Sequence, residues 1–345
     1  MYGSIINTSI VDIVKKVTKS KEKRYEVNEN PDYIYPENTE RQQITVGASS
    51  YIKIADGCDF NCGYCIIPQL RGHYHSRKIE NIVKEAKDLA QKGVSEIVLI
   101  AQDTTKYGLD LYGKVRLPEL LNDLCKIDGI KWVRFLYSYP ESITDELIRV
   151  VKENDKICKY FDLPIQHVSD EVLRRMNRKC TKEEIINLVQ KLRKEIPDVI
   201  LRTTLIVGFP GETEEQFDEL CEFIKEYPFN RLGAFAYSIE DGTPAAKFKD
   251  QLPKKIKEAR RRKIMTMQQG ISKELLEQHI GKQYKCLIEN VTFDGNYYIG
   301  RTYMDVPSED GVVFIENNQS VMINDFVNIK ITKAKEYDLY GKIAN

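Results

Sequence analysis

Long apolar runs are missing from this sequence of 345 residues. No stretch of eighteen or more apolar residues occurs, and the first residues lack the basic, apolar and small-residue order of a secretory signal. An excess of charge is missing as well, because 52 Lys and Arg balance 52 Asp and Glu. These absences argue against a membrane protein, a secreted protein and a chain-wide polyanion binder. We therefore expect a globular, cytoplasmic protein whose cysteines stay reduced.

Cysteine is absent before position 58, and then three cysteines fall within eight positions. The stretch GCDFNCGYCIIPQLRG, residues 57–72, places them at Cys58, Cys62 and Cys65. In a reducing compartment such a cluster is more typical of metal binding or catalysis than of disulfides. The other cysteines stand alone, and we expect small buried core residues at Cys125, Cys158, Cys180, Cys221 and Cys286.

Three thiols on one loop leave two kinds of metal site open. An iron–sulfur cubane usually has four thiolate ligands, so three local cysteines would leave one iron free to bind a substrate. A zinc site needs a fourth ligand, which His73 or His75 could supply, although structural zinc sites favour paired cysteine knuckles. Unliganded buried thiols are the least favoured interpretation, because a short polar loop has little core to pack into.

Short β-branched runs alternate with amphipathic segments from about residue 50 onward. We expect strands near 50–55, 95–101, 132–138, 160–166, 199–209 and 232–238, and helices near 78–92, 116–127, 144–154, 169–195 and 213–226. Thr181 with Glu184, and Thr213 with Gln216, fit capping boxes at helix starts. The alternation predicts right-handed βαβ units, and hence an α/β fold with a partial, TIM-like (βα)6 barrel.

Further segments flank this barrel, which we assign to residues 45–278. Residues 1–44 are a charged lead-in with one short amphipathic helix over 9–17. Residues 279–345 show short alternating strands separated by turn residues, which predict a small antiparallel β-barrel as a second domain. The basic stretch 254–263 indicates a solvated helix face, with a surface for RNA or another polyanion as the alternative.

Polar and glycine-rich residues follow every predicted strand. In chain order they are Cys58, then Gln102 and Asp103, Tyr137 and Tyr139, Gln166 and His167, the run GFPGET over 208–213, and Tyr237 with Ser238. Loops are polar in any protein, so each residue alone carries little weight. Because barrels of this kind build their pockets from the loops after the strands, we expect these residues to line one site.

The spacing Cys-x3-Cys-x2-Cys after the first strand of a (βα)6 barrel resembles the radical S-adenosylmethionine superfamily. Five segments in this order resemble its methylthiotransferase family: the cysteine loop, QDTTKYGLDLYG, DLPIQHVSDEVLRRMNR, RTTLIVGFPGETEEQF and YSIEDGTPA. The similarity covers roughly residues 45–345, and its C-terminal part resembles a TRAM domain. It is strongest to the branch that adds a methylthio group to the β-carbon of an aspartate in small-subunit ribosomal protein twelve.

The resemblance implies cofactors and their ligands. A 4Fe-4S cluster would sit on Cys58, Cys62 and Cys65, and its open iron would bind S-adenosylmethionine and cleave it to a 5′-deoxyadenosyl radical. Tyr64 would flank the cluster or the adenine, and Arg202 would pair with the cofactor carboxylate. Gln102 and Asp103 would meet the cofactor amino group. The remaining residues of the expected cofactor site are Gln166, Gly208, Phe209 and Pro210, the last three letting the adenine approach the backbone.

The same family carries an N-terminal domain whose three cysteines hold a second 4Fe-4S cluster, from which the inserted sulfur comes. Since no cysteine precedes Cys58, we expect residues 1–44 to be the remnant of that domain. The chain would then keep radical generation and lack sulfur insertion. The resemblance also implies partners, namely ribosomal protein twelve or the ribosome, and an electron donor such as flavodoxin or ferredoxin.

Two other functions remain as alternatives. A tRNA adenosine methylthiotransferase would share the cysteine loop and the terminal domain. From Gly281 onward, however, seven Lys or Arg stand against nine Asp or Glu, whereas an RNA-reading module should be basic. The segments TTKYGLDLYG and EYDLYG also resemble the protein-modifying branch. A zinc-stabilised, non-catalytic RNA-binding protein is the more distant alternative.

Overall fold

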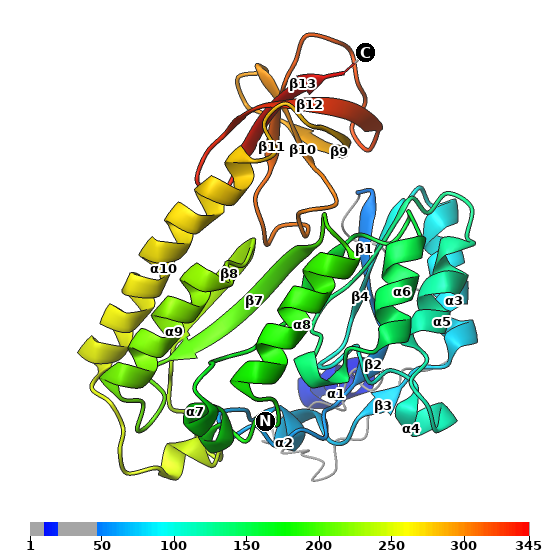
Figure 1. Ribbon diagram of the computed structural model, residues 1–345. Helices are drawn as coiled ribbons and strands as arrows, with labels where there is room; N and C mark the ends of the chain where they lie inside the picture. The colour runs from blue at the N-terminus through cyan, green and yellow to red at the C-terminus, as the bar shows by residue number, and fades with distance from the viewer. Residues whose placement is uncertain (1–9, 20–46, 345) are drawn as a thin grey trace.

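The computed structural model describes residues 10–19 and 47–344, and its main body is an α/β barrel followed by a small β-barrel (Figure 1). The strands of the first barrel are β1 (Ser49–Lys53), β4 (Glu96–Ile100), β5 (Trp132–Phe135), β6 (Tyr160–Asp162), β7 (Ile200–Val207) and β8 (Arg231–Ala236). They form two parallel sheets, β1-β4-β5 and β6-β7-β8. A parallel bridge between Val133 of β5 and Ile157, just before β6, links the first sheet to the segment that leads into the second. The predicted partial (βα)6 barrel is confirmed.

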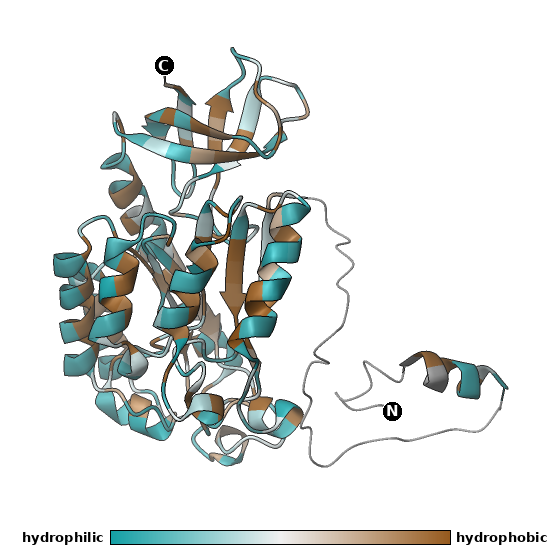
Figure 2. Cartoon of the chain, turned by 90° about the vertical axis from the view of Figure 1, so that its right-hand side faces the viewer, coloured by the Kyte–Doolittle hydropathy of each residue, from teal (hydrophilic) through white to brown (hydrophobic). Residues whose placement is uncertain are grey.

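Helices cover the outer face of the sheets, with their apolar stripes turned inward (Figure 2). The main ones are α3 (Ile79–Gln91), α5 (Leu117–Cys125), α6 (Asp145–Glu153), α8 (Lys182–Glu195) and α9 (Glu214–Glu226). Shorter elements in the loops are β2 (Ala55–Asp56), α2 (Ile67–Arg71), β3 (His75–Ser76), α4 (Leu109–Tyr112) and 3-10 turns at Pro140–Ser142 and Ala245–Lys247. These short elements all lie in loops, so they leave the predicted strand and helix order intact.

One predicted helix, over 169–195, is wrong because the segment forms two helices. The first, α7 (Asp170–Arg175), ends before Asn177, whose φ of 56° is left-handed and does not continue a helix. Thr181 then begins α8 with the predicted capping box, accepting from the N–H of Glu184 while the Glu184 carboxylate accepts from the N–H of Thr181. The second predicted box, Thr213 with Gln216, begins α9.

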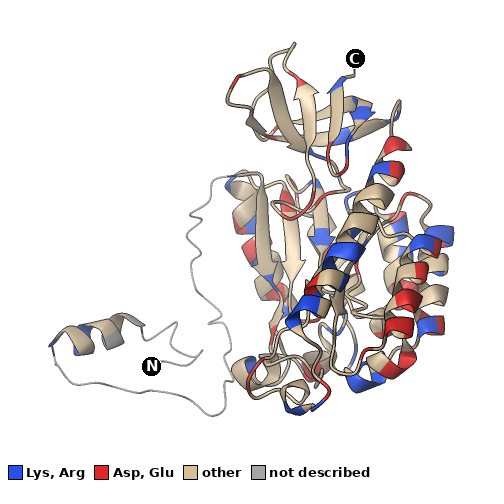
Figure 3. Ribbon diagram, turned by 90° about the vertical axis from the view of Figure 1, so that its left-hand side faces the viewer, with Lys and Arg blue, Asp and Glu red and all other residues tan. Residues whose placement is uncertain are grey.

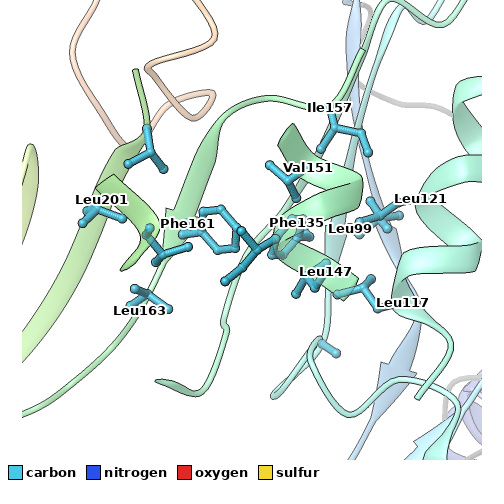
Figure 4. Packing of buried hydrophobic residues seen from close by; sticks show 14 of the residues in the cluster. Leu99, Leu117, Leu121, Phe135, Leu147, Val151, Ile157, Phe161, Leu163 and Leu201 are labelled. Atoms are coloured by element: carbon cyan, nitrogen blue, oxygen red, sulfur yellow. The ribbon is translucent and has the colours of Figure 1, made fainter. Parts of the chain in front are cut away.

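The core of the first barrel lies between the sheets and the helices (Figure 4). Leu99, Phe135 and Phe161 come from neighbouring strands, and the two phenylalanine rings meet edge to face with centroids 5.5 Å apart. Leu121 of α5 and Leu147 of α6 belong to the same buried cluster. Burial of each such side chain contributes about 1.5–3 kcal/mol. This core fixes the strands, and with them the loops that follow the strands.

The C-terminal domain is a closed barrel that the helix α10 (Lys254–Glu277) joins to the first barrel. Its strands are β9 (Gln283–Val291), β10 (Tyr297–Arg301), β11 (Val313–Glu316), β12 (Phe326–Ala334) and β13 (Leu339–Ile343). The expectation of an antiparallel barrel needs one correction, because β11 and β13 run parallel. β10 is antiparallel to β9 and β11 to β10, so β11 points the same way as β9. β12 is antiparallel to β9 and β13 to β12, so β13 points that way as well.

The basic stretch 254–263 forms the first part of α10, and Figure 3 shows its Lys and Arg along the helix. Lys257 and Arg260 are nevertheless buried. Arg260 donates to Glu212 at 2.7 Å, and the ammonium group of Lys257 lies 4.7 Å from the ring centroid of Tyr237. These contacts attach the helix to the first barrel. The predicted solvated face is confirmed for the exposed residues Lys254, Lys255, Arg262 and Lys263, but not for Lys257 and Arg260.

The C-terminal domain contacts every strand of the first barrel within the first three residues of that strand. The contacts join Ser49 and Glu96 to Arg301, Arg134 to the Tyr303 carbonyl, Tyr160 and Arg202 to Asp310, and Arg231 to Asp305. Parallel strands start at the same end of a barrel, so the C-terminal domain closes that end (Figure 1). The loops after the strands lie at the opposite end.

Glu96 is the centre of this junction. Its fully buried carboxylate accepts from Arg301 at 2.6 Å, from Ser49 at 2.6 Å and from Arg134 at 3.3 Å. Burial by itself raises the pKa of Glu96, but the guanidinium groups of Arg301 and Arg134 outweigh burial and hold the pKa below its ordinary 4.5. Arg301 also binds Glu289 of β9 at 2.7 Å. One carboxylate therefore connects strands of both domains.

Several smaller expectations concern single segments. The predicted short helix is confirmed as α1 (Ile10–Lys19), while the rest of residues 1–44 lies outside the described part of the chain. The five isolated cysteines are all buried, as predicted. Among the described residues, no helix is both long and apolar enough to cross a membrane.

Replacing Glu96 by Gln should lower the free energy of unfolding by about 3–5 kcal/mol, because the change leaves the buried Arg134 without a carboxylate and Arg301 with Glu289 alone. Since the folded-state pKa of Glu96 is lowered, this stabilisation is complete above pH 4.5 and is lost as the pH falls through the folded-state pKa. Urea unfolding at neutral and acidic pH measures both effects. Glu153→Gln, which removes an exposed partner of Arg149, is the control and should change little.

Candidate functional site

The cysteine loop leaves the barrel after β1 and returns to it after residue 74. β2 pairs with β3 at its base, and the N–H of Cys58 donates to the carbonyl of Gly72 at 3.1 Å. Gly57 has a φ of 77°, and a Cβ at this position would lie 1.9 Å from the carbonyl oxygen of His73. Only glycine fits there, so the base of the loop is fixed by the backbone.

The middle of the loop is attached to two distant segments. The N–H of Gly63 donates to the carbonyl of Met176, just after α7, and the carbonyl of Gly63 accepts from the N–H of Ala245, both at 2.8 Å. The thiols of Cys58 and Cys62 are buried, whereas Cys65 is partly exposed. The backbone thus holds the three thiols in one place without a disulfide.

The surroundings of the thiols are aromatic and apolar. Phe60 belongs to the same cluster, and Tyr64, Ile67 and Tyr139 pack against it. The hydroxyl of Tyr139 lies 3.8 Å from the sulfur of Cys62, and the N–H of Ile67 donates to the sulfur of Cys65 at 3.4 Å. The predicted residue Tyr64 therefore lies beside the thiols.

Burial raises the pKa of the Cys58 thiol to about 11 and also raises the pKa of Cys65. Both thiols of the metal-free chain therefore keep their protons at neutral pH, and metal binding would release them. His73 and His75, the candidate fourth ligands of the alternative zinc site, contact Asp59 and the His73 carbonyl, respectively. Among the described residues, no group of three or more His, Cys, Asp or Glu is gathered to hold a single metal ion. Thiolates that each hold a different iron of a cubane do not need to converge in that way.

Gln102 and Asp103 follow β4 and lie against the cysteine loop. The hydroxyl of Tyr74 donates to the carbonyl of Asp103 at 2.7 Å, and Thr105 donates its N–H to the Asp103 carboxylate at 2.9 Å. Burial raises the pKa of Asp103 to about 6. One oxygen of this carboxylate and the side-chain oxygen of Gln102 are buried without a hydrogen-bond partner. A polar group of a ligand would satisfy both.

Gln166 and His167 follow β6. Gln166 has a φ of 69°, exchanges backbone hydrogen bonds with Thr204 and Ile206 of β7, and leaves its side-chain oxygen buried and unpartnered. His167 is fully buried, and burial lowers its pKa to about 3, so the ring stays neutral. Gln166 is therefore available to a ligand. His167 supports the turn by accepting from the N–H of Ser169 through Nδ1, while its Nε2 is also buried without a hydrogen-bond partner.

The GFPGET run after β7 forms a tight turn around a carboxylate that sequence reasoning did not single out. Glu212 accepts from the N–H groups of Gly208 and Phe209 at 2.6 and 3.1 Å, and Arg260 of α10 holds its other oxygen. Gly208 has a φ of 70°, and a Cβ there would lie 2.5 Å from the Lys257 side chain. The Phe209 ring is buried against Tyr237, with centroids 5.3 Å apart. The turn thus offers a ligand its backbone rather than the Phe209 ring.

Arg202 does not join the residues beside the thiols. Its guanidinium lies 3.4 Å from Asp162 and 3.9 Å from both Glu309 and Asp310 of the C-terminal domain. It also lines a cavity of about 290 Å³ between β7, β8, α10 and that domain. The expected pairing of Arg202 with a cofactor carboxylate stays a prediction.

Three soft thiol donors and several orphaned polar oxygens at one end of the barrel fit an iron–sulfur cluster with a polar organic ligand beside it. Those oxygens belong to Gln102, Asp103 and Gln166. Arg178 is a further residue here that sequence reasoning missed, because nothing in the spacing of MNRKC marks a buried guanidinium.

Comparisons with known proteins show which families and structures this chain is similar to. Residues 52–224 match the family model of the radical SAM superfamily, and residues 280–344 match that of the TRAM domain. The ribosomal protein uS12 methylthiotransferase RimO of Alkaliphilus oremlandii is 61% identical over 302 residues, which are 87% of this chain and 69% of the relative. RimO of Lachnoclostridium phytofermentans is 50% identical over 99% of this chain and 77% of its own length. Among solved structures, the Escherichia coli radical SAM enzyme coproporphyrinogen III oxidase aligns with 73% of this chain and 66% of its own, with a TM-score of 0.47 and 15% identity.

Replacing Cys62 by Ala should strongly reduce the iron bound after anaerobic reconstitution, because two local thiolates cannot hold three corners of a cubane. The same loss is expected for Cys58→Ala and Cys65→Ala. Cys221→Ala removes a buried thiol elsewhere and is the matched control. Iron and sulfide analysis measures the result, and full iron content in the Cys62 variant would contradict the assignment.

Replacing Arg202 by Lys should lower the urea midpoint of unfolding, because a point charge cannot reach three carboxylates as the planar guanidinium does. Calorimetry with S-adenosylmethionine on the reconstituted variant tests the predicted cofactor role in the same sample. A loss of affinity supports pairing with the carboxylate. Unchanged affinity assigns Arg202 to the domain junction alone.

Proposed function

Because the chain belongs to the family of ribosomal protein uS12 methylthiotransferases within the radical SAM superfamily, we propose that it acts on an aspartate of uS12, which receives a methylthio group at its β-carbon. The observation that carries this proposal is the set of three thiols on one backbone-fixed loop at the open end of the barrel. Relatives at 61% and 50% identity bear the name of this activity.

Cys58, Cys62 and Cys65 would hold a 4Fe-4S cluster. When bound, the cluster with S-adenosylmethionine supplies the electron transfer that cleaves the cofactor, which is chemistry that a protein side chain does not provide. The protein binds and shields these groups. Deprotonating the Cys58 thiol, whose pKa burial raises to about 11, is the proton release that accompanies metal binding.

The polar residues of the open end would orient S-adenosylmethionine. The unpartnered oxygens of Gln102 and Asp103 would accept from its ammonium group, and that of Gln166 would accept from a ribose hydroxyl. The turn Gly208, Phe209 and Pro210 offers backbone to the adenine, with Glu212 and Arg260 holding the turn in shape. Tyr64 would cover the side of the loop that faces the cofactor.

Sulfur insertion needs a source of sulfur, for which we propose a second 4Fe-4S cluster. No cysteine precedes Cys58, and the five isolated cysteines are buried in the core. The residues of this sequence would perform the reductive cleavage and bind the substrate, and the ligands of the second cluster would have to be cysteines other than the five buried ones. A low-potential donor such as flavodoxin or ferredoxin would reduce the cluster, and the cytoplasm, where thiols stay reduced, suits the three ligands.

The reconstituted and dithionite-reduced chain should convert S-adenosylmethionine to 5′-deoxyadenosine and methionine, while added uS12 should stay without a methylthio group. Iron should correspond to one cubane per chain. Liquid chromatography and mass spectrometry measure both products, and Cys62→Ala should yield neither. Absence of 5′-deoxyadenosine from a chain with a full cluster would refute the proposed chemistry, and methylthiolated uS12 would refute the need for a second cluster.

A further inference from the structure

Two aromatic rings and two cations form a four-layer stack beside the thiols. The rings of Phe60 and Tyr139 lie parallel, with centroids 4.2 Å apart and an angle of 5° between them. The ammonium group of Lys106 is 3.6 Å from the Phe60 centroid, and the guanidinium carbon of Arg178 is 4.3 Å from the Tyr139 centroid. Each ring covers the inner face of the other, so the two cations must lie on the outer faces.

This stack joins four separate segments around the cysteine loop. Phe60 lies between Cys58 and Cys62 in the loop itself, and the Tyr139 hydroxyl is 3.8 Å from the sulfur of Cys62. Lys106 comes from the loop after β4 and Arg178 from the segment after α7. The stack therefore places two positive charges close to the thiol ligands, one on each side of the ring pair.

Arg178 is buried more deeply than its contacts explain. Its side chain is 1% exposed, it donates to the carbonyl of Pro164 at 3.2 Å, and the Glu141 carboxylate is 3.8 Å away. Two of its guanidinium nitrogens have no hydrogen-bond partner. A buried cation with so few partners costs several kcal/mol unless another negative group lies nearby. In this environment of low polarity its charge also acts more strongly than it would in water.

We propose that Arg178, assisted by Lys106, raises the reduction potential of the cluster held by Cys58, Cys62 and Cys65. This inference rests on the proposed function. Reduction adds a negative charge to the cluster, and a fixed positive charge nearby makes that addition more favourable; net charge and solvent exposure are what set such potentials. Arg178 is thus a positioning and tuning residue, since it acts on the cluster through its charge and on the loop through Tyr139.

The test is an anaerobic redox titration of the reconstituted chain, followed by electron paramagnetic resonance. Arg178→Gln, which removes the charge and keeps a hydrogen-bonding side chain, should make the cluster at least tenfold harder to reduce, about 59 mV for one electron. Arg178→Lys should restore most of the potential because it keeps the charge. Arg174→Gln removes an exposed charge from α7, four residues before Arg178, and should leave the potential unchanged.

Each result of the redox titration supports or refutes the proposed effect of Arg178 on the cluster. The inference is overturned if the cluster of the Arg178→Gln variant has the same reduction potential as that of the parent chain. It is also overturned if Arg178→Lys lowers the reduction potential as much as Arg178→Gln does. Should Arg178→Gln fail to take up a cluster, Lys106→Gln carries the test: its partly exposed position predicts a smaller lowering, and an unchanged potential refutes the role of the stack. A parent chain that binds no cluster would instead refute the proposed function.

Discussion

The buried carboxylate of Glu96 is the constraint on which the arrangement of the two domains depends. It stands between Arg134 of the first barrel and Arg301 of the second, and removing it would leave the buried Arg134 guanidinium without a carboxylate. A shared apolar cluster continues the junction, with Trp132 beside residues of the second domain such as Met304. Because this closes one end of the barrel, polar chemistry can gather only at the other.

At that open end, the backbone rather than the thiols determines the shape of the cysteine loop. Gly57 accepts a left-handed conformation against the His73 carbonyl, and Gly63 exchanges hydrogen bonds with Met176 and Ala245. These backbone contacts fix the loop independently of the thiols. Burial raises the pKa of the Cys58 thiol, so metal binding at this ligand releases a proton. Such preorganisation lowers the ordering cost of assembling a cluster.

Buried arginines stabilise three separate parts of the structure. Arg301 holds the domain junction, Arg260 holds the turn after β7 through Glu212, and Arg178 covers Tyr139 beside the cysteine loop. Each meets a different partner, which is a carboxylate in the first two cases and mainly an aromatic face in the third. A formal net charge of zero conceals this distribution, because it counts buried and solvated arginines alike.

The sequence by itself determined the features that depend on near neighbours in the chain. The six strands, the capping box at Thr181 and the spacing of Cys58, Cys62 and Cys65 follow from local periodicity, helix chemistry and loop length. Only the tertiary structure decided the parallel pairing of β11 with β13, the stack of Phe60 on Tyr139, and the burial of Arg178. These features join segments far apart in the sequence. Patterns along one sequence do not indicate which distant residues come into contact when the core packs.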